Sequence, residues 1–145
     1  MITVTYTDNS KAVFERFEDI KDYDSVIALE CSGNNLESLP PLPMMLRFLY
    51  CDNNKLKSLP ALPKTLVRID CYRNNLKSFP SSLLECHDLK YFDGDNNWME
   101  DIPYEFSEFI RLTTGCESPY SSCFVEDGHS LDGHIRLGDL TIFDG

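Results

Sequence analysis

A unit of about 20 residues occurs four times in succession between residues 26 and 103, and this period restricts the fold more than any other feature of the chain. Two copies read "LYCDNNKLKSLPALP" and "IDCYRNNLKSFP". The copies are offset by 20, 20 and 23 residues. The matching columns are Val26, Leu46, Leu66 and Leu89; Leu29, Leu49, Ile69 and Phe92; Cys31, Cys51, Cys71 and Gly94; Asn34, Asn54, Asn74 and Asn97; Leu36, Leu56, Leu76 and Met99; Leu39, Leu59, Phe79 and Ile102; and Pro40, Pro60, Pro80 and Pro103. Self-similarity at such a period predicts a solenoid of stacked units.

Each unit contains a short segment in which apolar and polar residues alternate. Leu49 and Cys51 are flanked by Phe48, Tyr50 and Asp52, which is the period of a β-strand. One unit cannot bury its own apolar side, so neighbouring strands are expected to pair in parallel and share one core. The asparagine column follows each strand, where its amide can bond backbone groups that the turn leaves unpaired.

The pattern LxxLxCxxNxLxxLPxLPxx resembles the leucine-rich repeat, most closely the short LPX type. That type is found in secreted effectors of pathogenic bacteria, and similar short repeats occur in proteins of large DNA viruses. The resemblance covers residues 26–103 and implies an α/β-type or mostly-β solenoid, with short parallel strands on its concave side. It says little about function, because this scaffold carries many unrelated binding roles.

The prolines and the chain ends complete the expected architecture. Prolines after each strand predict an extended, polyproline-like convex side. The third unit is longer, and Ser81 or Ser82 is expected to cap a helical turn that buries Leu84. Residues 1–25, with strand-like "ITVTYT" and "KAVFERF", predict a β-hairpin cap, and the repeats occupy residues 26–103.

Residues 104–145 are expected to form a mixed C-terminal cap within the same single domain. The segment "PYEFSEFIRL" predicts a short helix presenting Phe106, Phe109 and Ile110. Beyond it, "CFVEDG", "GHIRL" and "DLTIFDG" predict short strands separated by Asp-Gly turns.

The composition favours a protein partner over nucleic acid or membrane. The formal net charge is −11, whereas nucleic acids and anionic membranes select basic surfaces. No apolar run approaches the roughly 18 residues of a membrane span, and the first residues lack a Sec-type secretion signal. We therefore expect a cytoplasmic or otherwise reducing intracellular location, or the host cytosol or a virion if the source is a pathogen or virus, with the six cysteines reduced.

Three groups of cysteine and histidine residues are candidates for reactive or metal-binding sites. Cys31, Cys51 and Cys71 fall on the inward face and are interpreted as core packing. Beside Cys86, His87 suggests a nucleophile pair, but no oxyanion-hole motif accompanies it. The tail residues Cys116, Cys123, His129 and His134 have the spacing C-x6-C-x5-H-x4-H, whose residue types suit zinc. The first spacing is wider than in usual zinc sites, so two ordinary thiols and two surface histidines are the preferred interpretation, and no metal site is predicted.

No enzyme activity and no cofactor are predicted. The resembling effectors often carry a ubiquitin-ligase domain with a catalytic cysteine. This sequence shows no such domain and no Cys-x-Asp motif of that family, so the activity is not carried over.

The outward positions of the strands are the predicted binding site. Aromatic residues recur there without an architectural reason, and carboxylates beside them favour a basic protein or peptide. An alternative is a solvated sheet whose aromatics only pack across strands. The predicted partner-binding residues are Glu30, Phe48, Tyr50, Asp52, Arg68, Asp70, Tyr72, Tyr91, Asp93 and Asp95.

The predicted function is a non-enzymatic protein-interaction module. One alternative is a structural subunit or cement protein of a larger, possibly viral, assembly. A further alternative, taken from the resemblance, is a secreted effector that binds a host protein.

Overall fold

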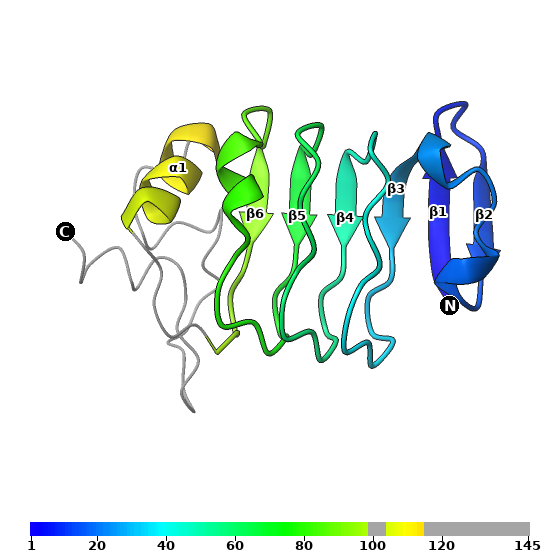
Figure 1. Cartoon of the computed structure of the whole chain (residues 1–145), viewed down its shortest axis with the longest axis horizontal. Coiled ribbons are helices and arrows are strands. Elements are labelled where there is room, and N and C mark those ends of the chain that lie inside the picture. Colours follow the sequence, from blue (N-terminus) through cyan, green and yellow to red (C-terminus); the bar gives the residue numbers. More distant parts are fainter. Residues whose placement is uncertain (99–103, 115–145) are drawn as a thin grey trace.

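A six-stranded sheet forms the body of the computed structural model, which describes residues 1–98 and 104–114. The strands run in the order β2-β1-β3-β4-β5-β6 across the sheet (Figure 1). Helix α1 (Tyr104–Thr114) lies at the end opposite the N-terminal hairpin. The strands are β1 (Ile2–Tyr6), β2 (Lys11–Phe14), β3 (Val26–Glu30), β4 (Phe48–Tyr50), β5 (Arg68–Asp70) and β6 (Tyr91–Asp93), and the 3-10 helices are η1 (Phe17–Asp19), η2 (Tyr23–Ser25) and η3 (Ser81–Glu85).

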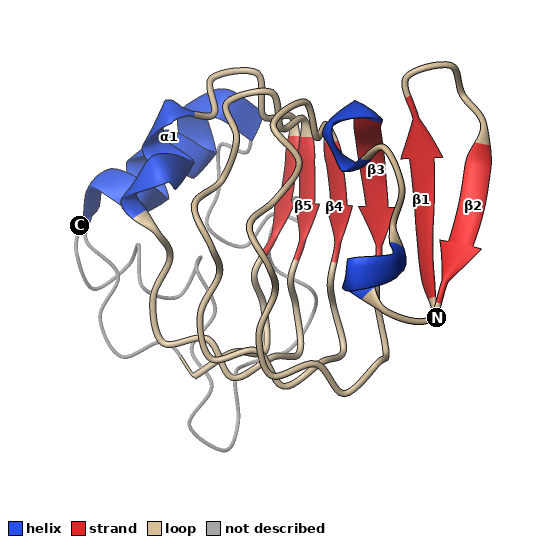
Figure 2. Cartoon of the chain, turned by 45° about the vertical axis from the view of Figure 1, so that its right-hand side comes forward, coloured by secondary structure: helices blue, strands red, loops and turns tan. Residues whose placement is uncertain are grey.

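Each repeat contributes one strand, and the four strands pair in parallel in the register that the repeat columns predict. Leu29 pairs with Leu49, Leu49 with Ile69, and Ile69 with Phe92. The return segments run from the end of one strand to the start of the next and enclose the core (Figure 2). The predicted mostly-β solenoid of leucine-rich-repeat type therefore agrees with the strand arrangement. No helix occurs within residues 31–47 or 51–67, as the prolines there predict.

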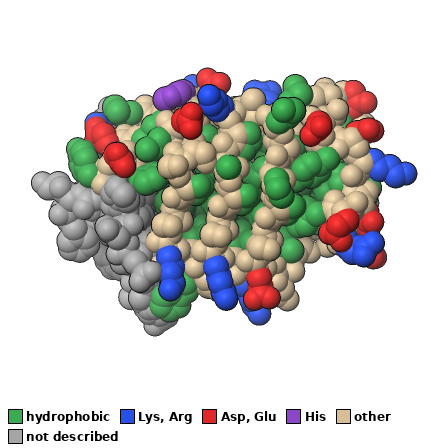
Figure 3. All heavy atoms as spheres, viewed as in Figure 1, with side chains coloured by type: hydrophobic (Ala, Val, Ile, Leu, Met, Phe, Trp, Pro, Cys, Tyr) green, Lys and Arg blue, Asp and Glu red, His purple; other side chains and the backbone are tan. Residues whose placement is uncertain are grey.

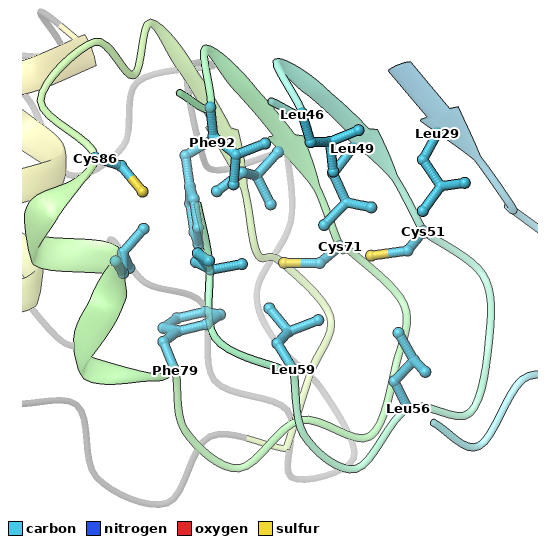
Figure 4. Close-up of a cluster of buried hydrophobic side chains, with 14 of the residues drawn as sticks. Leu29, Leu46, Leu49, Cys51, Leu56, Leu59, Cys71, Phe79, Cys86 and Phe92 are labelled. Carbon is cyan, nitrogen blue, oxygen red and sulfur yellow. The ribbon is translucent and has the colours of Figure 1, made fainter. Parts of the chain in front are cut away.

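The core lies between the sheet and the return segments. The strand columns of the first three repeats are completely buried: Val26, Leu46 and Leu66; Leu29, Leu49 and Ile69; and Cys31, Cys51 and Cys71. Figure 4 shows Leu49, Cys51 and Cys71 among the buried side chains. On the face shown in Figure 3, charged side chains lie mostly around the outline, and hydrophobic side chains occupy much of the area between them.

The asparagine column forms a ladder of buried hydrogen bonds beside the core. The Asn74 Nδ2 donates to the carbonyl oxygens of Cys51 and Cys71, both at 3.0 Å. Its Oδ1 accepts from the Leu56 backbone N–H at 3.0 Å. Asn54 and Asn97 make the equivalent bonds one repeat earlier and later. The predicted role of these amides is confirmed.

The predicted N-terminal hairpin is confirmed, and it extends the sheet of the solenoid. Strands β1 and β2 pair antiparallel, and β1 also pairs antiparallel with β3. Asn9 takes the left-handed conformation in the turn, with φ of 70°. Ile2 and Val4 are buried against the first repeat, so the hairpin covers that end of the core.

The longer third repeat contains the predicted helical turn, but two details of the prediction are wrong. Leu83, and not Leu84, is the fully buried leucine of η3, because the turn is a 3-10 helix that directs position 83 inward. Pro80 occupies the N-cap position and no side chain caps the helix. The Ser82 Oγ instead accepts a hydrogen bond of 2.7 Å from the Leu62 backbone N–H in the preceding repeat.

Helix α1 covers the other end of the core. Phe106 and Ile110 are buried, and Phe109 is partly buried, as predicted. The helix packs against η3 and β6. The short strands predicted after the helix lie outside the described residues.

Gly94 interrupts the cysteine column because two phenylalanine rings occupy the space. A Cβ at position 94 would lie 2.8 Å from the Phe79 Cζ and 2.8 Å from the Phe92 Cε1. The rings themselves meet edge to face, with centroids 5.1 Å apart. The fourth repeat therefore keeps its core filled with larger rings and no side chain at position 94.

Candidate interaction face

The outward positions of β3–β6, with the first outward residue after each strand, form the surface that we call the strand face. Three rows cross it, and the backbone pairing continues beyond the strands to hold the third row in line. The rows are Ala28, Phe48, Arg68 and Tyr91; Glu30, Tyr50, Asp70 and Asp93; and Ser32, Asp52, Tyr72 and Asp95.

Arg68 occupies the middle of the strand face between two tyrosines. Its guanidinium carbon lies 4.1 Å from the centre of the Tyr91 ring and 5.4 Å from that of Tyr50. The same guanidinium bonds the Asp70 carboxylate, with Nη2 and Nε each 3.1 Å from Oδ2. Four of the predicted site residues therefore form one cluster. Arginine stacked on aromatic faces is a rigid, partly dehydrated arrangement.

A second cluster surrounds Asp52. The Ser32 hydroxyl donates to its Oδ1 at 2.7 Å, and the Asn53 amide donates to its Oδ2 at 2.8 Å. Burial and, next in size, the Asp52 carboxylate raise the pKa of Tyr72, so this hydroxyl keeps its proton at neutral pH. Asp52 thus links β3, β4 and the residues after β5 across the face.

Three of the predicted acidic site residues are not accessible to a partner, contrary to the prediction. Asp70, Asp93 and Asp95 are buried, with exposed fractions of 6%, 2% and 1%. The physical reason for Asp70 is the Arg68 side chain that covers it. Asp93 and Asp95 turn toward the backbone, where they accept hydrogen bonds from the N–H groups of Asp95 and Asn96 at 3.1 and 2.8 Å.

The remaining predicted residues are accessible to different degrees. Glu30 is exposed, and the others are half-buried: Phe48, Tyr50, Asp52, Arg68, Tyr72 and Tyr91. The accessible carboxylates are Glu30 and Asp52, and they share the face with Arg68, while Arg73, next to Tyr72 in sequence, is exposed. Residues 99–103 and 115–145 hold eight of the 24 acidic residues and one of the 13 basic residues. Most of the net negative charge therefore comes from these two segments and not from residues of the strand face.

Sequence reasoning missed the neighbour of Phe48. The Arg47 guanidinium carbon lies 5.5 Å from the centre of the Phe48 ring. Position 47 directly precedes β4, so alternation alone assigns it to neither face of the sheet. The position of Arg68 between aromatic residues could be predicted from the sequence, since Arg68 falls in the same repeat column as Phe48 and Tyr91.

The cysteine column is part of the core and not a reactive centre. Cys31, Cys51, Cys71 and Cys86 are buried and unpaired. Burial raises the pKa of Cys31 to about 12 and that of Cys86 to about 11, and it raises the pKa values of Cys51 and Cys71 well above the ordinary range. Thiols held in the protonated form are poor nucleophiles and poor metal ligands.

Cys86 and His87 do not form a catalytic pair. The Cys86 Sγ donates to the Pro63 carbonyl oxygen at 3.4 Å. The His87 ring packs edge to face against Phe109, with centroids 5.9 Å apart. The two neighbouring side chains therefore have different surroundings.

We predict that the four buried thiols resist alkylation by N-ethylmaleimide in the folded protein and react fully in denaturant. Peptide mass spectrometry after timed labelling measures each cysteine separately. Folding raises the pKa values of these thiols, so they contribute to the free energy of unfolding fully below the unfolded pKa near 9. This contribution is lost as the pH rises toward the folded pKa values of 11 to 12. Denaturation midpoints measured between pH 7 and pH 11 test this slope. Rapid native labelling of Cys51 or Cys71 would contradict the burial argument.

Within residues 1–98 and 104–114, no three His, Cys, Asp or Glu side chains are placed to hold a metal ion. The zinc candidates Cys116, Cys123, His129 and His134 lie outside these residues. In the same ranges, no helix is both long enough and apolar enough to cross a membrane.

No protein-family model matches the sequence, and no curated protein matches it. Among solved structures, YopM from Yersinia enterocolitica WA-314 is similar, with 29% sequence identity and a TM-score of 0.43. The similarity covers 53% of this chain and 21% of the YopM chain, so it spans about one fifth of that protein. The fold and the face described above rest on the geometry of this chain.

Proposed function

We propose that the chain is a non-enzymatic protein-interaction module and that the strand face binds its partner. The observation that carries this proposal is the stack of Arg68 between Tyr50 and Tyr91 on the outward side of the sheet. The solenoid buries its core without these side chains, so their large aromatic area is not needed for folding. Tyrosine and arginine are also the residue types enriched among interface hot spots.

The same stack supports binding for an entropic reason. Arg68 is fixed by two rings and by the Asp70 carboxylate before any partner arrives. Asp52 is likewise held by Ser32 and Asn53. Association then orders fewer side chains, which reduces the entropic cost of binding.

We propose a basic protein or peptide as the partner, with its basic groups at Glu30 and Asp52. These are the accessible carboxylates on the strand face, and they lie on its β3–β4 side. Arg68 and Arg73 lie toward the β5 side, so a partner that is basic throughout fits the face less well than one with basic and apolar groups together. The net charge of −11 accelerates the approach of such a partner at low ionic strength.

Tyr50→Ala and Tyr72→Ala test this proposal. Each substitution is expected to weaken partner binding by about tenfold or more, because hot-spot truncations cost about 2 kcal/mol. The partner is first captured from the native source with the wild-type chain and identified, and titration calorimetry then gives the affinities. Tyr104→Ala is the matched control, because Tyr104 is an exposed tyrosine on α1.

Circular dichroism establishes that each variant is folded before binding is measured. Normal affinity of both Tyr50→Ala and Tyr72→Ala for the partner would refute the assignment of the strand face. A loss that is equal in Tyr104→Ala would place the contact elsewhere.

A further inference from the structure

A groove of about 450 Å³ lies beside the N-terminal ends of the central strands, and we call it the rim groove. Four residues at equivalent repeat positions near the strand starts line it, with three residues that lie two positions before them in sequence: Ile27, Arg47, Val67 and Lys90, and Met45, Thr65 and Asp88. It borders the strand face, whose three rows begin one residue later along each repeat, and the Arg47 guanidinium lies over the Phe48 ring of that face.

Backbone hydrogen bonds hold four of these residues in a line. The Arg47 N–H donates to the Ile27 carbonyl oxygen at 2.7 Å, and the Val67 N–H donates to that of Arg47 at 2.8 Å. The Lys90 N–H donates to that of Val67, also at 2.8 Å. The rim therefore alternates apolar, basic, apolar and basic side chains at the spacing of neighbouring strands.

The two basic residues of the rim groove have no acidic partner among the described residues. Arg16, Lys64, Arg68 and Arg111 each lie within 4.0 Å of a carboxylate. No such carboxylate accompanies Arg47 or Lys90 in the part of the chain that the structure describes. The Arg47 guanidinium lies over the Phe48 ring and forms no ion pair with a described carboxylate. Asp88 lines the groove but forms no ion pair with Lys90.

The apolar part of the groove supplies a second element of recognition. Ile27 and Val67 are half-buried and alternate with the basic residues, and Met45 is 48% exposed beside them. Methionine adapts its shape to different apolar groups and is common on peptide-binding surfaces. A ligand for this groove thus needs apolar groups between its charges.

We propose that the rim groove binds a short, extended acidic segment of a partner protein. Strands lie about 4.8 Å apart, which places the backbones of Arg47 and Lys90 about 10 Å apart. Residues three apart in a polyproline II segment point to the same side and lie about 9 Å apart. The matching ligand is therefore a Glu-x-x-Glu segment in this conformation, with its carboxylates at Arg47 and Lys90 and an apolar residue near Val67.

Asp88 also lines the groove, but the two basic residues Arg47 and Lys90 outnumber it, and the charge of more distant residues is weakened at physiological salt. Charges further away than about 8 Å are largely screened there. The rim groove would select an acidic segment, whereas the proposed strand-face partner is basic at its contact. The two surfaces are thus expected to bind different chemical groups, on one partner or on two.

The probe is a fluorescein-labelled peptide of three Glu-Pro-Val repeats, and the matched control peptide has three Gln-Pro-Val repeats. Fluorescence anisotropy with the full chain is expected to show binding of the glutamate peptide and at least tenfold weaker binding of the glutamine peptide. The double variant Arg47→Glu with Lys90→Glu is expected to reduce affinity for the glutamate peptide by at least tenfold. Raising the salt concentration is expected to weaken the same interaction.

The control variant carries Lys55→Glu with Lys57→Glu, which changes the net charge by the same amount at exposed positions after β4. It is expected to bind the glutamate peptide as the wild type does. Equal binding of both peptides, equal loss in both double variants, or no binding at 1 mM peptide would overturn the proposal. The single variant Lys90→Glu, which leaves the contact between Arg47 and Phe48 in place, is expected to leave binding at Tyr50 and Tyr72 intact, so failure here is distinguishable from failure of the strand face.

Discussion

Replacing Asn74 with alanine is expected to lower the free energy of unfolding by at least about 3 kcal/mol. The substitution removes the bonds to the carbonyl oxygens of Cys51 and Cys71 and to the N–H of Leu56. These backbone groups lie at buried positions, and leaving each one unpaired costs about 1–3 kcal/mol. Single domains have total stabilities of only about 5–15 kcal/mol. Urea denaturation followed by circular dichroism measures the loss.

Asn75→Ala is the matched control for this experiment. Asn75 is the next residue along the same turn, but it is only half-buried, and no side-chain hydrogen bond of Asn75 occurs among the described residues. Its replacement is expected to change the free energy of unfolding by about 0.5 kcal/mol or less. If Asn74→Ala and Asn75→Ala prove equally mild, the amide ladder does not stabilise the turns as its geometry indicates.

The sequence predicts the register of this sheet because a solenoid makes each residue a neighbour of its counterpart one repeat away. Leu49 packs beside Leu29 and Ile69 for no reason other than that spacing. The same logic identifies Asn74 as a structural residue and Cys51 as core. Where a repeat is regular, alignment of its columns is therefore close to a contact map.

Column alignment assigns a face but not a degree of exposure, and this explains the errors at the candidate site. Asp70 lies on the predicted face, yet the neighbouring Arg68 covers it, because the two side chains follow each other on the same side of one strand. Leu83 illustrates a related limit. The inserted residues of the third repeat have no counterpart in the other units, so neither the helix type nor its phase follows from the columns.

The predicted charge of the strand face is the part of the functional prediction that changes most. The carboxylates in the outward strand columns predicted an acidic strand face, but the accessible ones there are Glu30 and Asp52, and Arg68 lies on the same face. The aromatic residues give stronger support for a binding face, because Tyr50 and Tyr91 are held around Arg68 in a fixed geometry. Their packing across strands and their availability for a partner are compatible, since each ring remains only half-buried.

Gly94→Cys restores the residue type of the other three repeats, and we expect it to destabilise the protein by about 1–3 kcal/mol. The added Cβ would meet the Phe79 Cζ and the Phe92 Cε1 at 2.8 Å, which is closer than van der Waals contact allows. Both rings are buried and meet edge to face, so neither moves without disturbing the core. Thermal and urea denaturation of the variant measure the effect.

The double variant Gly94→Cys with Phe79→Leu separates steric conflict from other causes. Leu59 fills the position of Phe79 in the preceding repeat, beside Cys71, so the smaller side chain makes room for the thiol. Phe79→Leu alone should also destabilise the protein, because it leaves a cavity. The double variant is expected to be more stable than the sum of the single effects predicts, although not fully restored, since Phe92 still crowds position 94. Simple additivity would show that Gly94 is glycine for a reason other than the two rings.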